Sequence, residues 1–552
     1  MACPICGGPP RRSRVILNTE DIACKVRSSF GPLISTHRGD VTCLLSNAKT
    51  DLADYDAQIS RLESSLILLK QKRDRLQKYV VNCQSLLAPI RRLPPEILSH
   101  IFLLCCEMNI FDPANKVDLP AFTLSAVCSY WRNIAIATPR LWATLMIPFH
   151  TLMLRNPSIE PNNLWLIPLM VPAIQLCLQR SAEAPLTLEL SAFTLDDFDD
   201  YDGIMRELVR QSHRWYHVKV DIQDSPFLNS PGHDLISLVT SAPCLEILEL
   251  EQDNEEDFTA ALHACNFAPR LHTLSLTSFC PPSTAPLPWT QITTLNLDCI
   301  NHVEVLKLLQ ICSHVTNLSL RNVQFDEANN FNDSSVSVVS NRISSVTLGL
   351  SVHPWMIRVS TLDALLSRLT LPSLCSLAIV AAQGEITDSG KEIWPIESFA
   401  SFLMRSRCPI TSLTIQNTPI SDTEIISLLR LVPNLQELNV CDCSQTRTVT
   451  DEFLEAMHTL NCTNYGAASQ IPLVPRLKSI NFRVQDLSFD PGKFIDMVRS
   501  RWVPEPEYAS QIGISSLKSV KLLVKEREVD SCTFRSLLQL DGFGLQVEIL
   551  AI

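Results

Sequence analysis

Residues 271–276 read Leu-His-Thr-Leu-Ser-Leu, with apolar residues at the first, fourth and sixth positions. The last two of these, Leu274 and Leu276, are two residues apart and therefore face the same side of a short strand. The pattern returns along the chain from about residue 185 to residue 522. Self-similarity of this kind is the sequence signature of a repeat protein.

The repeated triads are separated by segments with a helical pattern. Residues 303–311, 362–369, 399–403 and 425–429 place apolar side chains at helical spacing. After a first member at residues 185–190, the triads are Trp215/Val218/Val220, Leu245/Leu248/Leu250, Leu271/Leu274/Leu276, Ile292/Leu295/Leu297, Val315/Leu318/Leu320, Ile343/Val346/Leu348, Leu374/Leu377/Ile379, Ile410/Leu413/Ile415, Leu435/Leu438/Val440, Leu477/Ile480/Phe482 and Leu517/Val520/Leu522.

Alternating short strands and helices predict an α/β fold. We expect residues 148–552 to form an irregular solenoid with a parallel sheet, which resembles a leucine-rich repeat. A single doubly wound α/β domain fits this pattern poorly, because eleven segments match one strand template. Little glycine is present, 14 residues against 35 prolines, so glycine-rich phosphate loops are not expected either.

Side chains that alternate with the buried strand positions should point to the concave face of the solenoid. They are polar or small, as a protein-binding surface or a merely solvated one would require. The candidates for contact with a target protein are Glu249, Glu251, Asn296, Asp298, Arg321, Asn439, Arg483 and Lys521.

Residues 86–147 have a different pattern. Leu93-Pro94-Pro95-Glu96 begins a helix, because proline suits the first helical turn and Glu96 complements its dipole. A polar loop at residues 107–120 and a second apolar helical stripe follow. The run LPPEILSHIF at 93–102, followed by LSAVCSYWRNIAIATPRLWATL at 124–145, resembles the F-box-like motif of fungal F-box proteins.

The resemblance implies a short all-helical F-box that docks on the Skp adaptor and cullin of an SCF-type ubiquitin ligase and presents a target protein. The alternative is a set of helices that only caps the next domain. Carried over by position, the adaptor-facing residues are Leu93, Pro94, Ile97, Leu98, Ile101, Phe102, Leu124, Val127, Cys128, Trp131 and Ile134.

A heptad pattern precedes this segment, within residues 49–85. Apolar residues recur at alternating intervals of three and four from Leu52 to Val80, with Arg73 the exception. The pattern predicts a long helix, which either pairs with a second copy as a coiled coil or folds back on its own chain.

Residues 1–48 lack sustained periodicity and contain a CxxC pair, Cys3 and Cys6. Two thiolates at this spacing can supply half of a zinc site, which would need two more ligands. Cys24, His37 and Cys43 are the nearby candidates, and a loosely folded terminus without metal is the alternative. No other metal and no cofactor is expected.

Composition excludes several function classes. The formal net charge is −12, which gives no basic surface for nucleic acid. The apolar segment 164–178 contains two prolines and is short of the roughly 20 residues of a membrane span, so no membrane association is expected. No secretory signal precedes the 20 cysteines, most of which stand singly in apolar runs, so we expect a cytoplasmic or nuclear protein with reduced thiols.

Catalytic motifs such as GxGxxG, GxxxxGK[ST], GxSxG and HExxH are missing from the sequence. We therefore expect no enzyme activity. The sequence predicts a substrate-recognition adaptor of a ubiquitin ligase, with a structural scaffold that acts without ubiquitin as the alternative.

Overall fold

The computed structural model describes residues 13–16, 19–28, 35–112, 116–148, 167–192, 207–222, 241–252, 268–278, 280, 287–323, 337–350, 359–381, 395–443, 446–459, 472–487, 489–525 and 533–551. Two compact units divide the chain, Met1–Leu98 and Ser99–Ile552, called unit 1 and unit 2 below. The CxxC pair of Cys3 and Cys6 lies outside the described residues. Among the described residues no group of His, Cys, Asp and Glu side chains could hold a metal ion.

Unit 1 is built around one long helix. The elements are α1 (Thr19–Ser28), α2 (Ser35–Leu87), the 3-10 helix η1 (Pro89–Arg92) and the beginning of α3 (Pro95–Cys105). The 53 residues of α2 contain the predicted heptads but begin well before residue 49, because the apolar spacing continues upstream and no proline interrupts it. Arg14 is held against α2 by ion pairs with Asp51 (2.7 Å) and Asp54 (2.8 Å).

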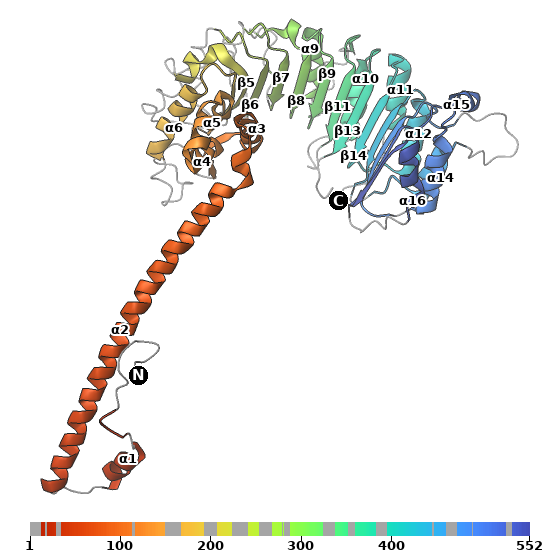
Figure 1. Cartoon of the computed structure of the whole chain (residues 1–552). Helices are drawn as coiled ribbons and strands as arrows, with labels where there is room; N and C mark the ends of the chain where they lie inside the picture. The colour runs from red at the N-terminus through yellow and green to blue at the C-terminus, as the bar shows by residue number, and fades with distance from the viewer. Residues whose placement is uncertain are drawn as a thin grey trace. The chain divides into compact units, whose positions relative to one another are not determined.

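Unit 2 contains a sheet of sixteen strands whose order in space follows their order in the chain, apart from β1 and β2 at one edge (Figure 1). From β3 to β18 each pair of neighbours is parallel. The strands are β1 (Asn109–Asp112), β2 (Lys116–Asp118), β3 (Thr144–Pro148), β4 (Leu186–Ala192), β5 (Trp215–Ile222), β6 (Ile247–Gln252), β7 (Thr273–Thr277), β8 (Thr294–Asp298), β9 (Asn317–Arg321), β11 (Ser345–Leu350), β13 (Ser376–Ala381), β14 (Ser412–Gln416), β15 (Glu437–Cys441), β16 (Ser479–Val484), β17 (Ser519–Val524) and β18 (Gln546–Ala551). A separate pair is formed by β10 (Val338–Val339) and β12 (Leu369–Thr370). The predicted α/β solenoid with a parallel sheet is confirmed.

Helices follow or connect many of these strands. They are α4 (Pro120–Val127), α5 (Ser129–Ile136), α6 (Ile167–Arg180), α9 (His302–Ile311), α10 (Val359–Arg368), α11 (Ile396–Ser406), α12 (Asp422–Leu431), α13 (Asp451–Met457), α14 (Pro491–Arg501), α15 (Pro506–Ile512) and α16 (Arg535–Leu538). The 3-10 helices are η2 (Pro139–Trp142), η5 (Ser212–Arg214), η8 (Trp289–Gln291) and η10 (Gln539–Phe543). In α12, Ser421 and Glu424 form a reciprocal capping box that fixes where the helix begins.

Within the sixteen-stranded sheet, the predicted apolar positions are buried on every strand from β4 to β17, whereas the separate strands β10 and β12 were not predicted. In β7, Leu274 and Leu276 are buried whereas Thr273, Ser275 and Thr277 are half-buried. Apart from a register shift between Leu186 and Thr187 of β4, neighbouring strands align residue for residue, so the apolar pairs stack into continuous layers across the sheet. These layers form the core together with the buried faces of the helices.

Two strands at the ends of the repeat array, β3 and β18, were not predicted from the sequence. Strand β3 follows the same template, with Trp142, Leu145 and Ile147 at its apolar positions, but it lies in the segment assigned to the F-box. Strand β18 pairs Val547 with Val520 of β17, yet glycine occupies the first position of its triad.

The segment 86–147 is not all-helical, contrary to expectation. Its polar loop contains β1 and β2, and β1 pairs with β3, so the segment begins the same sheet as the repeats. Its second helical stripe is broken at Cys128, whose extended backbone (φ −160°, ψ 170°) separates α4 from α5. The boundary at residue 147/148 stays a prediction; the two compact units meet between Leu98 and Ser99.

The buried guanidinium of Arg501, in the late repeats, is matched to main-chain carbonyls. Arg501 of α14 donates to the carbonyls of Met457 (2.6 Å), Leu473 (2.6 Å) and Val474 (3.2 Å). Burial lowers the pKa of its guanidinium to about 10. These bonds tie the end of α13 and the segment that precedes β16 to one helix, since buried carbonyls need a donor.

None of the described helices has the length and apolar character needed to cross a membrane. The apolar segment that suggested a span contributes α6, in which Ile174 and Cys177 are fully buried.

Candidate functional site

Helix α3 has one buried and one exposed apolar stripe. Leu98 and Phe102 are buried, whereas Ile97 is 50% exposed and Leu104 is 70% exposed. Ile101, between the two exposed residues on the helix surface, is half-buried. Before this helix, Leu93 is half-buried and Pro94 exposed. Within the predicted set, Leu98 and Phe102 therefore contribute to packing, and Ile97 and Ile101 offer contact area.

Helices α4 and α5 divide in the same way. Val127 is 58% exposed, Leu124 is half-buried, and Ile134 is buried. Trp131 is half-buried because its ring packs on Phe102 of α3, with centroids 4.9 Å apart. The half-buried Cys128 caps α5, since its sulfur accepts the N–H of Trp131 at 3.5 Å.

Sequence reasoning missed three exposed apolar residues on these helices: Leu104, Tyr130 at 40% and Ile136 at 43% exposure. The spacing carried a signal for Leu104, which lies seven residues after Ile97 and three after Ile101. Burial could not be assigned from the sequence, because α3 is apolar on both sides.

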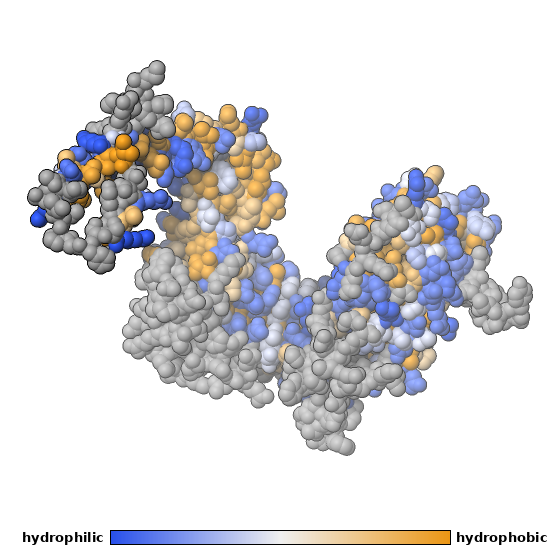
Figure 2. Space-filling model, turned by 90° about the horizontal axis from the view of Figure 1, so that it is seen from below, coloured by the Kyte–Doolittle hydropathy of each residue, from blue (hydrophilic) through white to orange (hydrophobic). Residues whose placement is uncertain are grey.

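Exposed apolar side chains are concentrated on this part of unit 2. Among its described residues, four large exposed apolar side chains lie between 104 and 136, and the other nine are spread over residues 169 to 550. We call Ile101, Leu104, Val127 and Tyr130 the docking residues. Such concentrations of exposed apolar residues are typical of protein-interaction sites, and apolar side chains are also visible at the surface in Figure 2.

The docking residues belong to helices that are fixed to the first strands of the sheet. The buried amide of Asn109 in β1 donates to the carbonyl of Leu141 (2.9 Å) and accepts the N–H of Ala121 at the start of α4 (3.3 Å). The buried Trp142 donates through Nε1 to the carbonyl of Ala135 (2.8 Å), and the guanidinium of Arg180 lies 4.5 Å from its ring centroid. The helices therefore cap the solenoid and expose apolar residues at the same time.

A second surface is the open face of the sheet, formed by the strand positions that alternate with the buried layers. All the predicted target-contact residues lie on it. In the strand register Glu249, Asn296, Asn439 and Lys521 belong to one row. The next row contains Glu251, Asp298, Arg321 and Arg483.

One end of the open face, over β4 to β6, is acidic. Glu189, Asp221, Glu249 and Glu251 surround one lysine, Lys219. The Lys219 Nζ lies 3.0 Å from Glu189 Oε1; burial alone would lower the lysine pKa, but Glu189 and the other carboxylates raise it. A hydrogen bond from His217 at 3.0 Å lowers the pKa of Glu249. Sequence reasoning missed Glu189 and Asp221 because it considered the face only from β6 onward.

The middle and far parts of the open face differ in charge. Asn296 and Asn439 donate to hydroxyls of the neighbouring strands, Ser275 at 3.0 Å and Thr414 at 3.1 Å. Farther along, Arg483 is exposed and Lys521 pairs with Glu548 at 2.8 Å. The exposed Arg321 lies against Gly349 of the next strand, where a Cβ would meet the arginine Cγ at 2.7 Å. The face therefore runs from acidic through neutral to more basic.

The fifteen cysteines of the described part of the chain are all free thiols. Burial raises the pKa of the Cys106 thiol to about 11 and those of Cys177 and Cys312 to about 12. Thiols this hard to ionise are poor nucleophiles at neutral pH, so these three serve as small core residues.

No protein-family model matches the chain, and no curated protein matches its sequence. The solved structure of the Rad7 and Elc1 complex in yeast is similar over 69% of this chain and 95% of its own, at 14% sequence identity and a TM-score of 0.28. A TM-score this low supports no inference about this chain.

Proposed function

We propose that the chain is a non-catalytic substrate-recognition adaptor of an SCF-type ubiquitin ligase. In this proposal α3 to α5 bind the Skp adaptor, which links the chain to a cullin, and the open face of the solenoid binds the target protein. The motif at residues 93–145, which resembles an F-box, gives the class of partner. The observation that carries the proposal is the concentration of exposed apolar residues on these helices.

The division between buried and exposed residues suggests how binding would work. Phe102, Trp131 and Trp142 hold the helices in place, so the docking residues would meet the adaptor without rearrangement of the core. Catalysis would come from the ligase partners, because tethering a target near a charged conjugating enzyme raises its effective concentration.

The charges of the open face favour one order of charges along the bound target. A protein segment with basic groups at one end and acidic groups at the other would match the acidic side chains over β4 to β6 and the basic ones over β16 and β17. Complementary charge of this kind selects partners and speeds association. The reduced thiols support action in the cytoplasm or the nucleus.

The test is binding of the purified full chain to a fungal Skp adaptor, measured by calorimetry. We expect Val127→Asp combined with Leu104→Asp to weaken binding by more than about 30-fold, because both side chains would be interface anchors. Leu169→Asp is the matched control: this leucine of α6 is 53% exposed and lies outside the docking residues. An adaptor that fails to bind the unaltered chain would refute the proposed function.

A scaffold that assembles proteins without ubiquitin is the second candidate, favoured by the long exposed apolar seam of α2. Reconstitution separates the two functions. A target captured by the open face should be ubiquitinated in the presence of the Skp adaptor, cullin and conjugating enzyme if the first is right, and should remain unmodified if the second is right.

A further inference from the structure

The helix α2 carries an uncovered apolar seam longer than the heptads first suggest. With the a and d positions continued in both directions, the seam has fourteen members: Val41, Leu45, Ala48, Leu52, Tyr55, Ile59, Leu62, Leu66, Leu69, Arg73, Leu76, Val80, Cys83 and Leu87. Its eleven large apolar side chains are between 38% and 75% exposed. No described segment of unit 1 covers them.

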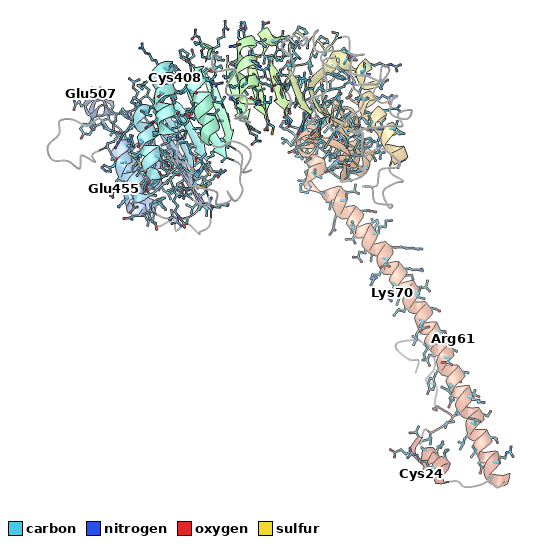
Figure 3. All side chains as sticks on the ribbon, turned by 180° about the vertical axis from the view of Figure 1, so that it is seen from behind. Cys24, Arg61, Lys70, Cys408, Glu455 and Glu507 are labelled. Carbon is cyan, nitrogen blue, oxygen red and sulfur yellow. The ribbon has the colours of Figure 1, made fainter. Side chains whose placement is uncertain are left out.

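A seam with this period is suited to another helix of the same kind. Sustained apolar positions at a mean spacing of 3.5 residues specify a coiled coil rather than packing on a flat surface. Side chains project from α2 along its length, Arg61 and Lys70 among them (Figure 3). The 53 residues of α2 span about 80 Å, and a helix derives most of its stability from packing an apolar face.

The distribution of charge along α2 favours one orientation of the partner helix, parallel or antiparallel. Between residues 41 and 63 there are four acidic and two basic side chains, and this half stays net negative when Arg14, paired with Asp51 and Asp54, is counted with it. Between residues 65 and 87 there are five basic and one acidic. A parallel partner would place like halves together. An antiparallel partner with the same sequence places the acidic half of each helix against the basic half of the other.

The individual positions support the same direction. Full overlap of two antiparallel copies puts the two-fold axis at Ser64 and brings every a position opposite a d position. Arg73 then faces Tyr55 of the second copy, where a cation can rest on the aromatic ring. Asp56 and Lys70, which flank the seam, lie together twice by symmetry, and Glu63 meets its own copy once.

Parallel pairing gives a poorer set of contacts. Arg73 would face Arg73 inside the seam, and Asp51 would flank Asp56 twice, with no oppositely charged pair across the interface. We propose that α2 binds a second copy of this chain as an antiparallel coiled coil centred on Ser64. The proposal is independent of adaptor binding, since it uses only residues 41–87.

Sedimentation of the full chain at several concentrations tests the pairing. We expect a dimer, which Lys70→Glu weakens about tenfold because both Asp56–Lys70 pairs become repulsive. The combined change Asp56→Lys with Lys70→Glu restores the pairs and should return the affinity to within about threefold. Lys78→Glu is the matched control, since it alters the same charge on the outer side of the helix and should leave the dimer intact.

Oxidative cross-linking through Cys83 tests the direction. In the antiparallel register Cys83 faces Leu45 of the second copy and lies about 57 Å from the other Cys83. We expect Leu45→Cys to give a cross-linked dimer that is lost when Cys83→Ser is added. A disulfide between the Cys83 residues of the two copies, identified by peptide mapping of the cross-linked unaltered chain, would show a parallel pair and overturn the proposal, as would a chain that stays monomeric at every concentration.

Discussion

Asp442 offers a quantitative test of the packing between two late repeats. It follows β15 directly and is 2% exposed. One carboxylate oxygen accepts the N–H groups of Thr448 (3.0 Å) and Val449 (3.3 Å). Burial raises the pKa of this carboxyl to about 6, although both hydrogen bonds act to lower it. The protein therefore carries a carboxylate whose charge opposes folding at neutral pH.

The sign and size of the effect follow from the difference between the folded and unfolded states. An unfolded aspartate has a pKa of 3.8, so between pH 3.8 and about 6 the folded state binds one more proton than the unfolded state. The contribution of Asp442 to the free energy of unfolding then falls as the pH rises, by about 1.4 kcal/mol per pH unit. Over this window the loss amounts to about 3 kcal/mol.

The change to test is Asp442→Asn, which keeps an oxygen acceptor for the two N–H groups and removes the charge. We expect the variant to gain about 3 kcal/mol relative to the unaltered protein between pH 4 and pH 7, with no further gain above pH 7. Urea unfolding followed by circular dichroism at several pH values measures this difference. Glu437→Gln, at an exposed position of β15, controls for the loss of one negative charge.

A stability difference between the Asp442→Asn variant and the unaltered protein that stays constant from pH 4 to pH 7 would refute the reasoning. It would show that the carboxyl titrates alike in both states. A difference that grows with falling pH would mean that hydrogen bonding outweighs burial, and would reverse the assigned sign.

Three further changes probe the packing by thermal unfolding. Gly349→Ala should destabilise unit 2 by about 1–3 kcal/mol, because the new Cβ collides with Arg321, whereas Gly542→Ala has open space around it and should have a much smaller effect. Arg501→Met should cost about 3–5 kcal/mol, since three buried carbonyls lose their donor; an unchanged melting temperature would contradict this. Trp142→Phe removes one buried hydrogen bond and should cost about 1–3 kcal/mol of unfolding free energy. A loss below about 0.5 kcal/mol, the size of a surface substitution, would contradict the role of Trp142 in fixing the helices to the first strands of the sheet.

The strands were predictable because one local rule repeats. Each repeat needs two apolar residues on one side of its strand. All the strands must share the same register, because they pair side by side in one parallel sheet. Strand β18 was missed where Gly544 breaks the template, and β1 and β2 because their three or four residues are too short for any periodic signal. The break at Cys128 was also invisible, since apolar spacing continues through it.

The docking residues were only partly predictable. The motif located α3 to α5, but the sequence could not separate Phe102, which is buried, from Leu104, which is exposed. That separation depends on where β1 and β3 bring the helices, through the contacts of Asn109 and Trp142. Such long-range contacts leave no periodic trace in the sequence.

The open face and the helix α2 would contribute differently to target recognition. Among the described residues, the strands of the open face carry no concentration of large exposed apolar side chains. Their charge order, acidic over β4 to β6 and basic near Arg483, is therefore better suited to choosing partners than to holding them tightly. A dimer through α2 would present two such faces in one particle. A target with two recognition segments would then bind the second face at an effective concentration in the millimolar range, which can raise the overall affinity 100-fold or more. Selectivity would therefore come from the sheet, and residence time from the pairing of the helices.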